Sequence, residues 1–180
     1  GVLFDISLPT VVVAVLGIPE TIIGFLEYLL FLNMTIAQSN VKEKKYQKSI
    51  QFIKSLNEEH KIDYALKYLY NKFENWIFCG FYRKKENQLE ISIYHSDNIP
   101  CSPIHMNGVC GQSIANQETI IVDDVNSFEN HIVCDSNSKS EIAIPFTKDN
   151  IEYVLDIDSK ELNDFDEIDK KYLQKILKEL

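Results

Sequence analysis

The order in which hydrophobic periodicity changes along the chain is the feature that most constrains its fold. Apolar residues first recur at helical spacing, in a stripe of Tyr46, Ile50 and Ile53 and then in a longer stripe between Ile62 and Phe73. Two pairs of strand-like segments follow, a short helix is predicted between them, and a final helix closes the sequence. This order predicts an α+β domain whose antiparallel sheet carries its helices on one face.

The strand-like segments are rich in aromatic and β-branched residues, as is typical of a half-buried sheet. They span residues 76–82 and 89–94 in the first pair and residues 141–146 and 153–158 in the second, with a brief strand at 119–122. Each pair is separated by a short polar turn, so both pairs are predicted to form hairpins.

Two helices are predicted beside two long loops. Residues 108–117 are expected to form a short helix, and the last helix is expected to begin at an N-cap Asp164, with Glu167 three residues later. Residues 96–107 and 123–140 show no periodicity and are expected to be loops. Loops of this length in a compact domain usually carry function, and both contain cysteines.

The N-terminal region differs from the rest, because residues 1–41 contain no Lys or Arg and are crowded with apolar residues. There is no basic start and no small-residue cleavage site, so a secretory signal is not predicted. Three interpretations remain open: a dispensable or spurious extension with translation starting at Met34, a single membrane span over residues 8–33, or a packed helical hairpin. We assign residues 1–40 to an apolar extension and residues 41–180 to the functional domain.

The charge and the cysteine content limit the classes of binding partner and the cellular compartment that we expect for this protein. The 180 residues are about one domain long, and a formal net charge of -9 without a basic stripe argues against nucleic acid and anionic membrane surfaces as partners. The four cysteines are not spaced as CxxC pairs and are too few for a disulfide scaffold, which predicts reduced thiols in the cytoplasm. If residues 8–33 span a membrane, the lysines from Lys42 onward keep the domain on the cytosolic side.

The four cysteines differ in their surroundings. Cys79 lies inside a strand and is expected to be a small buried hydrophobe. Cys110 opens the predicted short helix, where backbone N–H groups and the helix dipole would lower the pKa of its thiol, although a packing role between glycines is equally open. Cys134 lies in a polar loop with no packing reason for its presence, and Cys101 lies in the other long loop. Cys134 is therefore the strongest candidate for chemistry.

A group of carboxylates forms a second candidate site. In the predicted strand 153–158, the period of two places Asp156 and Asp158 on one face and their apolar neighbours on the other. Glu141 opens the adjacent strand, so antiparallel pairing would bring it close to both aspartates. Such a pair of aspartates is either solvent-exposed or binds a cation, and three carboxylates beside a thiol would suit a substrate ammonium group.

A zinc site is the competing interpretation of the same loops. Cys101 and His105, together with His131 and Cys134, offer two thiols and two imidazoles that a tetrahedral Zn²⁺ could accept. Their spacing is only loosely similar to that of a zinc finger, and such a site would not use the carboxylates. We therefore expect no metal.

Several ordered blocks of sequence together resemble one known family. The blocks are Gly108–Gly111 (GVCG), Val122–Val125 (VDDV), His131–Asp135 (HIVCD), Ser138–Ile142 (SKSEI) and Val154–Ser159 (VLDIDS). From about Tyr46 to the C-terminus, the chain resembles the GAF-domain free methionine-(R)-sulfoxide reductases. The resemblance implies a GAF-like antiparallel sheet with long loops closing a small-molecule pocket.

The resemblance also implies roles for three thiols. It places the catalytic cysteine at Cys134 and the recycling cysteine at Cys101, and the third family cysteine at Cys110. In this family the catalytic cysteine becomes a sulfenic acid, which a second thiol converts to a disulfide. Whether Cys101 or Cys110 is that second thiol is left open, because the segment between them is one residue shorter than in the family pattern.

Four further residues match the substrate pocket of that family. The ammonium-binding acids fall on Glu141, Asp156 and Asp158, and the pocket tryptophan falls on Trp76. Trp76 is separated from Gly80 by three residues rather than the one typical of the family. Because an insertion of two preserves the face of a strand, we expect Trp76 to face the pocket.

The implied reaction is the reduction of free L-methionine-(R)-S-oxide to L-methionine. It proceeds through a cysteine sulfenic acid and an intramolecular disulfide, which thioredoxin reduces as an external partner, and it uses no cofactor. The alternative is a GAF module that binds a small molecule as a sensor without turning it over. Formation of a homodimer is left open.

Overall fold

The computed structural model describes residues 20–129 and 134–180 of the chain. A boundary between Lys44 and Lys45 separates two compact units. The second unit, Lys45–Leu180, contains the sheet, and the helix α2 (Glu20–Lys54) crosses the boundary.

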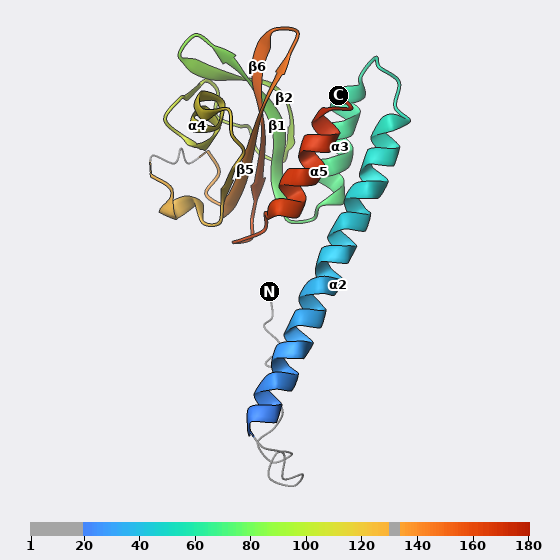
Figure 1. Ribbon diagram of the computed structural model, residues 1–180. Helices are drawn as coiled ribbons and strands as arrows, with labels where there is room; N and C mark the ends of the chain where they lie inside the picture. The colour runs from blue at the N-terminus through green and yellow to red at the C-terminus, as the bar shows by residue number, and fades with distance from the viewer. Residues whose placement is uncertain (1–19, 130–133) are drawn as a thin grey trace. The chain divides into compact units, whose positions relative to one another are not determined.

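A six-stranded antiparallel sheet forms the centre of the second unit, in the order β3-β2-β1-β6-β5-β4 (Figure 1). The strands are β1 (Trp76–Lys85), β2 (Gln88–Ser96), β3 (Ile104–His105), β4 (Ile120–Val122), β5 (Ser140–Lys148) and β6 (Ile151–Ser159). The α+β class and both hairpins agree with the prediction, although the hairpin strands are longer than expected. Asp149 and Asn150, both with positive φ, form the tight β5–β6 turn that suits the twist of the strands.

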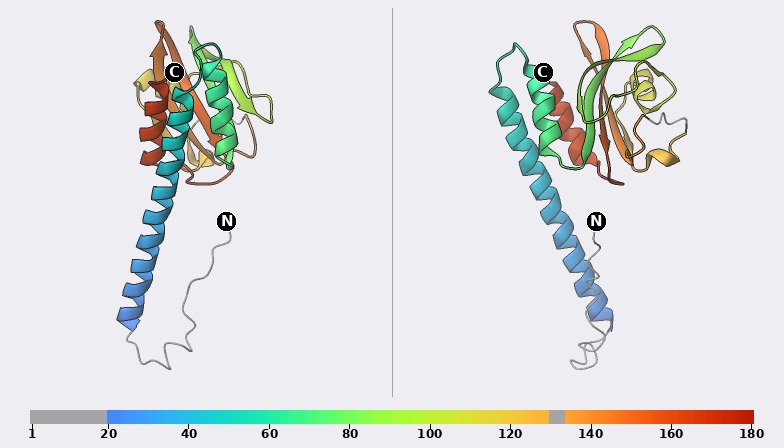
Figure 2. Two further views of the ribbon diagram at one scale, coloured as in Figure 1. Left: turned by 90° about the vertical axis from the view of Figure 1, so that its right-hand side faces the viewer. Right: turned by 180° about the vertical axis from the view of Figure 1, so that it is seen from behind.

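Helices cover both faces of the sheet. The part of α2 from Lys45 onward packs on one face together with α3 (Lys61–Lys72) and α5 (Glu167–Leu177), as two views of the chain show (Figures 1 and 2). The short α4 (Val109–Asn116) lies on the opposite face, which corrects the expectation of helices on one face only. The helix α4 buries Val109 and Ile114 in a second, smaller apolar cluster against β5 and β6.

The larger core lies between the sheet and the three helices. Tyr46 and Ile53 of α2 are fully buried in it together with Leu66 of α3 and Leu173 of α5. The hydroxyl of Tyr46 donates a hydrogen bond to Asp169 Oδ1 at 2.7 Å, which satisfies two polar groups at the centre of this core. The helical stripes expected from Tyr46 onward are thus the faces that bury against the sheet.

The start of α5 differs by two residues from the prediction. Asp166 is the N-cap, and its side chain accepts hydrogen bonds from the backbone N–H groups of Ile168 and Asp169. The Asp169 side chain accepts in return from the Asp166 backbone N–H, which completes a capping box. The expected cap, Asp164, instead accepts a 2.6 Å hydrogen bond from the Ser159 hydroxyl at the end of β6.

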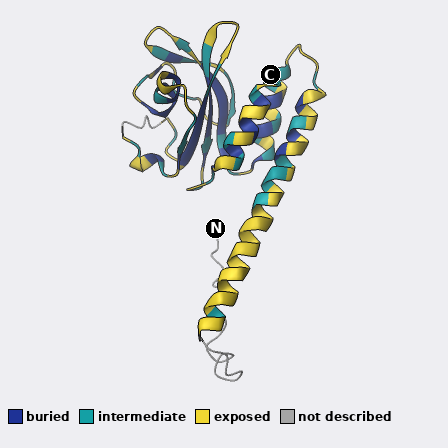
Figure 3. Cartoon of the chain, viewed as in Figure 1, coloured by how far each residue is buried: buried dark blue, intermediate teal, exposed yellow. Residues whose placement is uncertain are grey.

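The part of α2 that precedes the boundary exposes apolar side chains. Every residue from Gly24 to Gln38 is exposed, including Phe25, Phe31 and Met34 (Figure 3). Within the described residues, one helix, Thr21–Lys54, is long and apolar enough to cross a membrane by length and composition. The expected span starts at residue 8, outside the described residues, so the span stays a prediction.

A truncation tests how much this segment contributes to stability. A chain that begins at Met34 is expected to keep its unfolding temperature within about 2 °C, because the described residues before Met34 bury almost no side chain. A chain that begins at Leu56 also loses the buried Tyr46 and Ile53, and should unfold at least about 10 °C lower. Thermal unfolding followed by circular dichroism measures the unfolding temperatures of both truncated chains. A large drop for the first truncation would show that the N-terminal segment stabilises the domain.

Candidate active site

A pocket lies on the face of the sheet that carries α4. Strands β5 and β6 contribute Glu141 and Asp156, and α4 contributes Cys110. The long loop before α4 adds residues 98–100, and the long loop after β4 adds Cys134. Both long loops therefore reach the pocket, as their length predicts.

The strand register brings three carboxylates to this pocket. Glu141 of β5 pairs directly with Asp158 of β6, and Asp156 lies two residues earlier on the same face of β6. Asp158 accepts a 2.7 Å hydrogen bond from the Ser138 hydroxyl. The atom Oδ1 of Asp156 is buried without a hydrogen-bond partner. The structure thus places the three predicted acids together, one of them with an unused buried oxygen.

The electrostatics of the pocket favour protonated carboxyl groups. Burial, reinforced by the charge of Asp158, raises the pKa of Glu141 to about 8. Burial and the neighbouring charge of Glu141 raise the pKa of Asp156 well above its usual value. The described residues that line the pocket include no Lys or Arg to offset these charges. A cation that enters the pocket would therefore be bound by carboxyl groups that release their protons to the solvent.

The pKa of Glu141 predicts a pH-dependent stability. Between about pH 4.5 and pH 8 the folded chain retains a proton on Glu141 that the unfolded chain has lost, so the free energy of unfolding falls as pH rises. This stability is fully present below about pH 4.5 and is lost as pH rises through about 8. Urea unfolding of the ligand-free protein across this range is expected to show a steeper decline for the wild type than for Glu141→Gln. Identical slopes would contradict the assigned pKa.

Two of the predicted cysteines are neighbours beside the pocket. Cys134, on the loop after β4, lines the pocket, and Cys101 lies close enough to influence its thiol. Cys134 is exposed at the surface, but partial desolvation of its thiol and the neighbouring Cys101 raise its pKa. The backbone carbonyl of Cys101 accepts a 2.8 Å hydrogen bond from the Tyr82 hydroxyl of β1, which holds Cys101 in place. The shorter segment between Cys101 and Cys110 therefore does not keep Cys101 away from Cys134.

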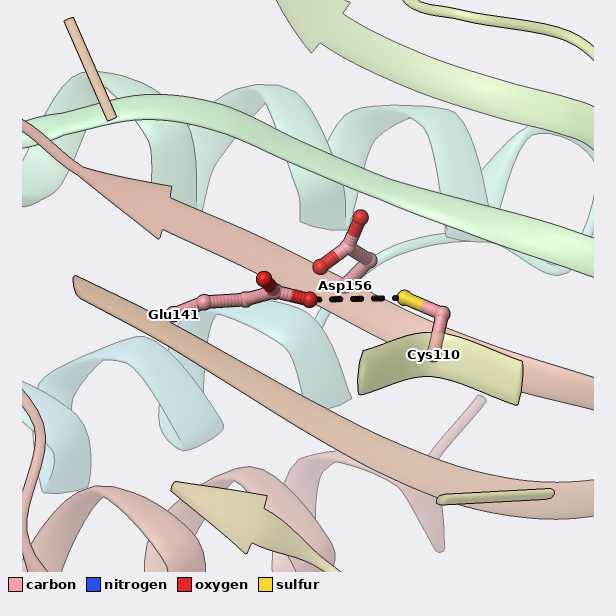
Figure 4. Close-up of side chains that lie close together, drawn as sticks. All are labelled: Cys110, Glu141 and Asp156. Atoms are coloured by element: carbon pink, nitrogen blue, oxygen red, sulfur yellow. Dashed lines mark hydrogen bonds between the residues drawn. The ribbon is translucent and has the colours of Figure 1, made fainter. Parts of the chain in front are cut away.

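The third predicted thiol lies deeper. Cys110 is buried, and its Sγ donates to Glu141 Oε1 at 3.7 Å, beside Asp156 (Figure 4). Burial and the charges of Asp156 and Glu141 raise the pKa of the Cys110 thiol well above its usual value. The expected lowering of this pKa is wrong, because burial and two nearby carboxylates outweigh the partial charge of a helix end.

A glycine fixes the position of Cys110. A Cβ at Gly111 would lie 2.2 Å from the backbone oxygen of Met106, so only glycine allows the first turn of α4 to approach the preceding loop this closely. The sequence Gly108–Gly111 thus holds the Cys110 side chain between the loop and the carboxylates.

Trp76 does not line the pocket, which corrects its expected role. The β1–β6 register shifts between Trp76 and Phe78, so the face of the strand changes at this irregularity. Trp76 consequently packs in the larger core, stacked on Phe73 with a centroid separation of 4.2 Å and in contact with Phe165. An insertion of two residues preserves the face of a strand only where the strand is regular, and β1 is irregular at this point.

Phe78 and Tyr82 are pocket residues that sequence reasoning missed. Both line the pocket from β1, and the ring of Phe78 also stacks on Tyr94 of β2 at 6.0 Å. Phe78, Gly80 and Tyr82 alternate along the strand, and this alternation is the signal that could have identified them. Ser138 was also missed, because a serine in a polar loop gives no such signal.

Three further residues considered in the sequence analysis are Cys79, His105 and His131. Cys79 is fully buried in the larger core, as expected for a small hydrophobe. His105 lines the pocket, but His131, which the zinc interpretation requires, lies outside the described residues. All four cysteines are free thiols.

Comparisons with known proteins identify relatives of this chain. A scan against protein-family models finds no match. The chain is 39% identical over 145 residues to protein YtsP of Bacillus subtilis, covering 76% of this chain and 88% of that protein. It is 48% identical over 107 residues to GAF domain-containing protein A of Dictyostelium discoideum (58% and 67% coverage). It is 33% identical over 114 residues to the free methionine-R-sulfoxide reductase of Escherichia coli (62% and 68% coverage).

Solved structures share the fold. The free methionine-R-sulfoxide reductase of Neisseria meningitidis, in complex with its substrate, superposes with a TM-score of 0.68 at 28% identity, covering 79% of this chain and 87% of that one. A substrate complex of fRMsr from Staphylococcus aureus gives a TM-score of 0.63 at 33% identity, with 74% and 92% coverage. The chain belongs to the GAF-domain family that includes the free methionine-R-sulfoxide reductases.

Proposed function

We propose that the protein reduces free L-methionine-(R)-S-oxide to L-methionine. The observation that carries the proposal is a pocket lined by Cys134, Glu141 and Asp156, with Cys101 as a neighbour of Cys134. The pocket offers the thiol of Cys134 for a sulfoxide and carboxyl groups for an ammonium, the two groups that one free amino acid would present. Relatives named as reductases of this substrate support it.

The first step joins the Cys134 sulfur to the sulfoxide oxygen. The thiol reacts with the sulfoxide so that the oxygen and the thiol proton end together on Cys134 as a sulfenic acid, and methionine leaves. Sulfur of the substrate is reduced by two electrons, and the sulfur of Cys134 is oxidised by two. A proton is transferred to the oxygen in this step, so the sulfenic acid forms without charge.

The second step regenerates the enzyme. The thiol of Cys101 displaces hydroxide from the sulfenic acid, water leaves, and a Cys101–Cys134 disulfide forms. The proximity of Cys101 to Cys134 favours Cys101 over the buried Cys110, whose thiol donates a hydrogen bond to Glu141. Thioredoxin then reduces the disulfide by thiol–disulfide exchange, and we place the protein in the cytoplasm, where thiols are kept reduced.

The carboxylates select the free amino acid. Glu141, Asp156 and Asp158 share one face of the β5–β6 hairpin and would surround the α-ammonium of the substrate. A methionine sulfoxide within a peptide has no such ammonium and would leave these groups buried without a cation. Discrimination by a buried polar partner of this kind is typically large.

A coupled assay tests the proposal. Purified protein with thioredoxin, its reductase and NADPH is expected to oxidise NADPH with free methionine-(R)-sulfoxide, and not with the S epimer or a peptide sulfoxide. If the R epimer binds without any NADPH oxidation or disulfide formation, the protein is a ligand-binding GAF sensor instead. Equal rates with the peptide substrate would contradict the assigned role of the carboxylates.

Removal of the second thiol should stop recycling without stopping chemistry. Cys101→Ser is expected to release about one methionine per chain and then to stall, because the sulfenic acid on Cys134 finds no partner thiol. The number of methionine molecules released per chain, with substrate in excess and thioredoxin present, measures this. Continued cycling by Cys101→Ser and a stall in Cys110→Ser would transfer the resolving role to Cys110.

A further inference from the structure

We propose that Cys110, Glu141 and Asp156 form a binding site for Zn²⁺, which competes with the ammonium of an amino-acid substrate. The three side chains come from α4, β5 and β6 and converge in one corner of the pocket (Figure 4). Their ligand atoms, one per residue, all lie within 4.8 Å of one another, and all three residues are buried. The inhibitory consequence rests on the proposed function, whereas zinc binding does not.

The distances suit a tetrahedral zinc ion. With Zn–S of about 2.3 Å and Zn–O of about 2.1 Å, a sulfur and an oxygen bound to the same tetrahedral ion lie about 3.6 Å apart. The separation of Cys110 Sγ and Glu141 Oε1 is 3.7 Å. The two atoms therefore already have the separation that zinc binding would require.

An unused polar atom also points to a cationic ligand. Asp156 is only 6% exposed, yet its Oδ1 has no hydrogen-bond partner. A buried carboxylate oxygen without a partner costs free energy, which a bound cation would recover. The described residues lining the pocket include no Lys or Arg that could serve as this cation.

The ligand set selects the metal. One thiolate and two carboxylates favour Zn²⁺ over Mg²⁺ or Ca²⁺, which bind oxygen ligands only. Three protein ligands leave the fourth zinc position open toward the pocket, as in zinc sites that bind exchangeable ligands. Because Glu141 and Asp156 are also the proposed ammonium ligands, zinc and substrate exclude each other. This cluster shares no residue with the expected zinc site at Cys101, His105, His131 and Cys134.

Co²⁺ substitution provides the direct test, because a thiolate bound to Co²⁺ gives a charge-transfer absorption band. The reduced full chain is expected to bind about one Co²⁺ with this band, and Zn²⁺ should displace it. Cys110→Ser should abolish the band and weaken Zn²⁺ binding by at least about 100-fold. Asp156→Asn should weaken binding while keeping the band.

The matched control removes the other thiols of the pocket. The double variant with Cys101→Ser and Cys134→Ser is expected to bind Zn²⁺ and Co²⁺ as the wild type does. A band that persists in Cys110→Ser and disappears in the double variant would overturn the proposal, as would a chain that binds no metal.

Free methionine should raise the apparent Kd for Zn²⁺, and an unchanged Kd would contradict a shared site. Zinc binding at Cys110 in a chain that lacks reductase activity would leave this inference standing and refute the proposed function.

Discussion

Cys134→Ser is expected to lower thioredoxin-dependent reduction of free methionine-(R)-sulfoxide by at least about 1000-fold. The serine hydroxyl cannot accept the sulfoxide oxygen or form a disulfide, so neither step of the reaction can proceed. Cys134 is exposed, so the substitution should leave the fold intact. Steady-state NADPH oxidation and methionine release both measure the loss.

The matched control for this variant is Cys79→Ala. Cys79 is fully buried in the larger core, on the face of the sheet opposite the pocket. Its substitution should cost about 1 kcal/mol of stability and leave turnover within about threefold of the wild type. Retention of more than a tenth of the activity by Cys134→Ser would assign the attack to another thiol.

Asp156→Asn is expected to lower kcat/KM for the free amino acid by about 100-fold or more. Truncating one partner of a buried charge pair typically costs about 2–5 kcal/mol of binding free energy, and the amide offers the ammonium no negative charge. The same variant should unfold at a higher temperature than the wild type without ligand, because it removes a buried acid whose charge is opposed by Glu141. In this variant kcat/KM is thus expected to fall while the unfolding temperature of the ligand-free protein rises.

Asp149→Asn is the matched control, because it changes the net charge by the same amount. Asp149 is exposed in the β5–β6 turn and has a φ of 52°, a conformation that asparagine adopts readily. It should change neither kcat/KM nor the unfolding temperature appreciably. If both variants reduce the substrate equally well, the ammonium is bound elsewhere.

Much of the fold follows from periodicity. The helical stripes around Tyr46 and from Ile62 onward are buried, and the two hairpins pair as their alternation indicates. The cap of α5 was misplaced because Asp164 and Asp166 both precede the helix, and only tertiary contacts decide between them: Asp164 is engaged by Ser159. The opposite-face position of α4 could not be predicted, because a short helix carries too little pattern to indicate which face of a sheet it covers.

The positions of the three carboxylates could be predicted from the sequence, whereas the position of Trp76 and the pKa of Cys110 could not. The strict alternation around Asp156 and Asp158 survives because β6 is regular there, and the register with β5 adds Glu141. The predicted pocket position of Trp76 is wrong because an irregularity of β1 next to it turns its side chain to the other face of the sheet. Counting residues in the sequence cannot detect such an irregularity. The pKa of Cys110 was predicted in the wrong direction, since the helix end was visible in the sequence and the enclosing burial was not.

The most direct test of the account is a single turnover without a reductant. One equivalent of free methionine-(R)-sulfoxide, added to the fully reduced chain, is expected to yield one methionine per chain and an intact mass lower by two hydrogen atoms. Peptide mapping by mass spectrometry should then locate a disulfide between Cys134 and Cys101. An unchanged mass with no methionine formed, or a disulfide that does not include Cys134, would contradict the proposed reaction.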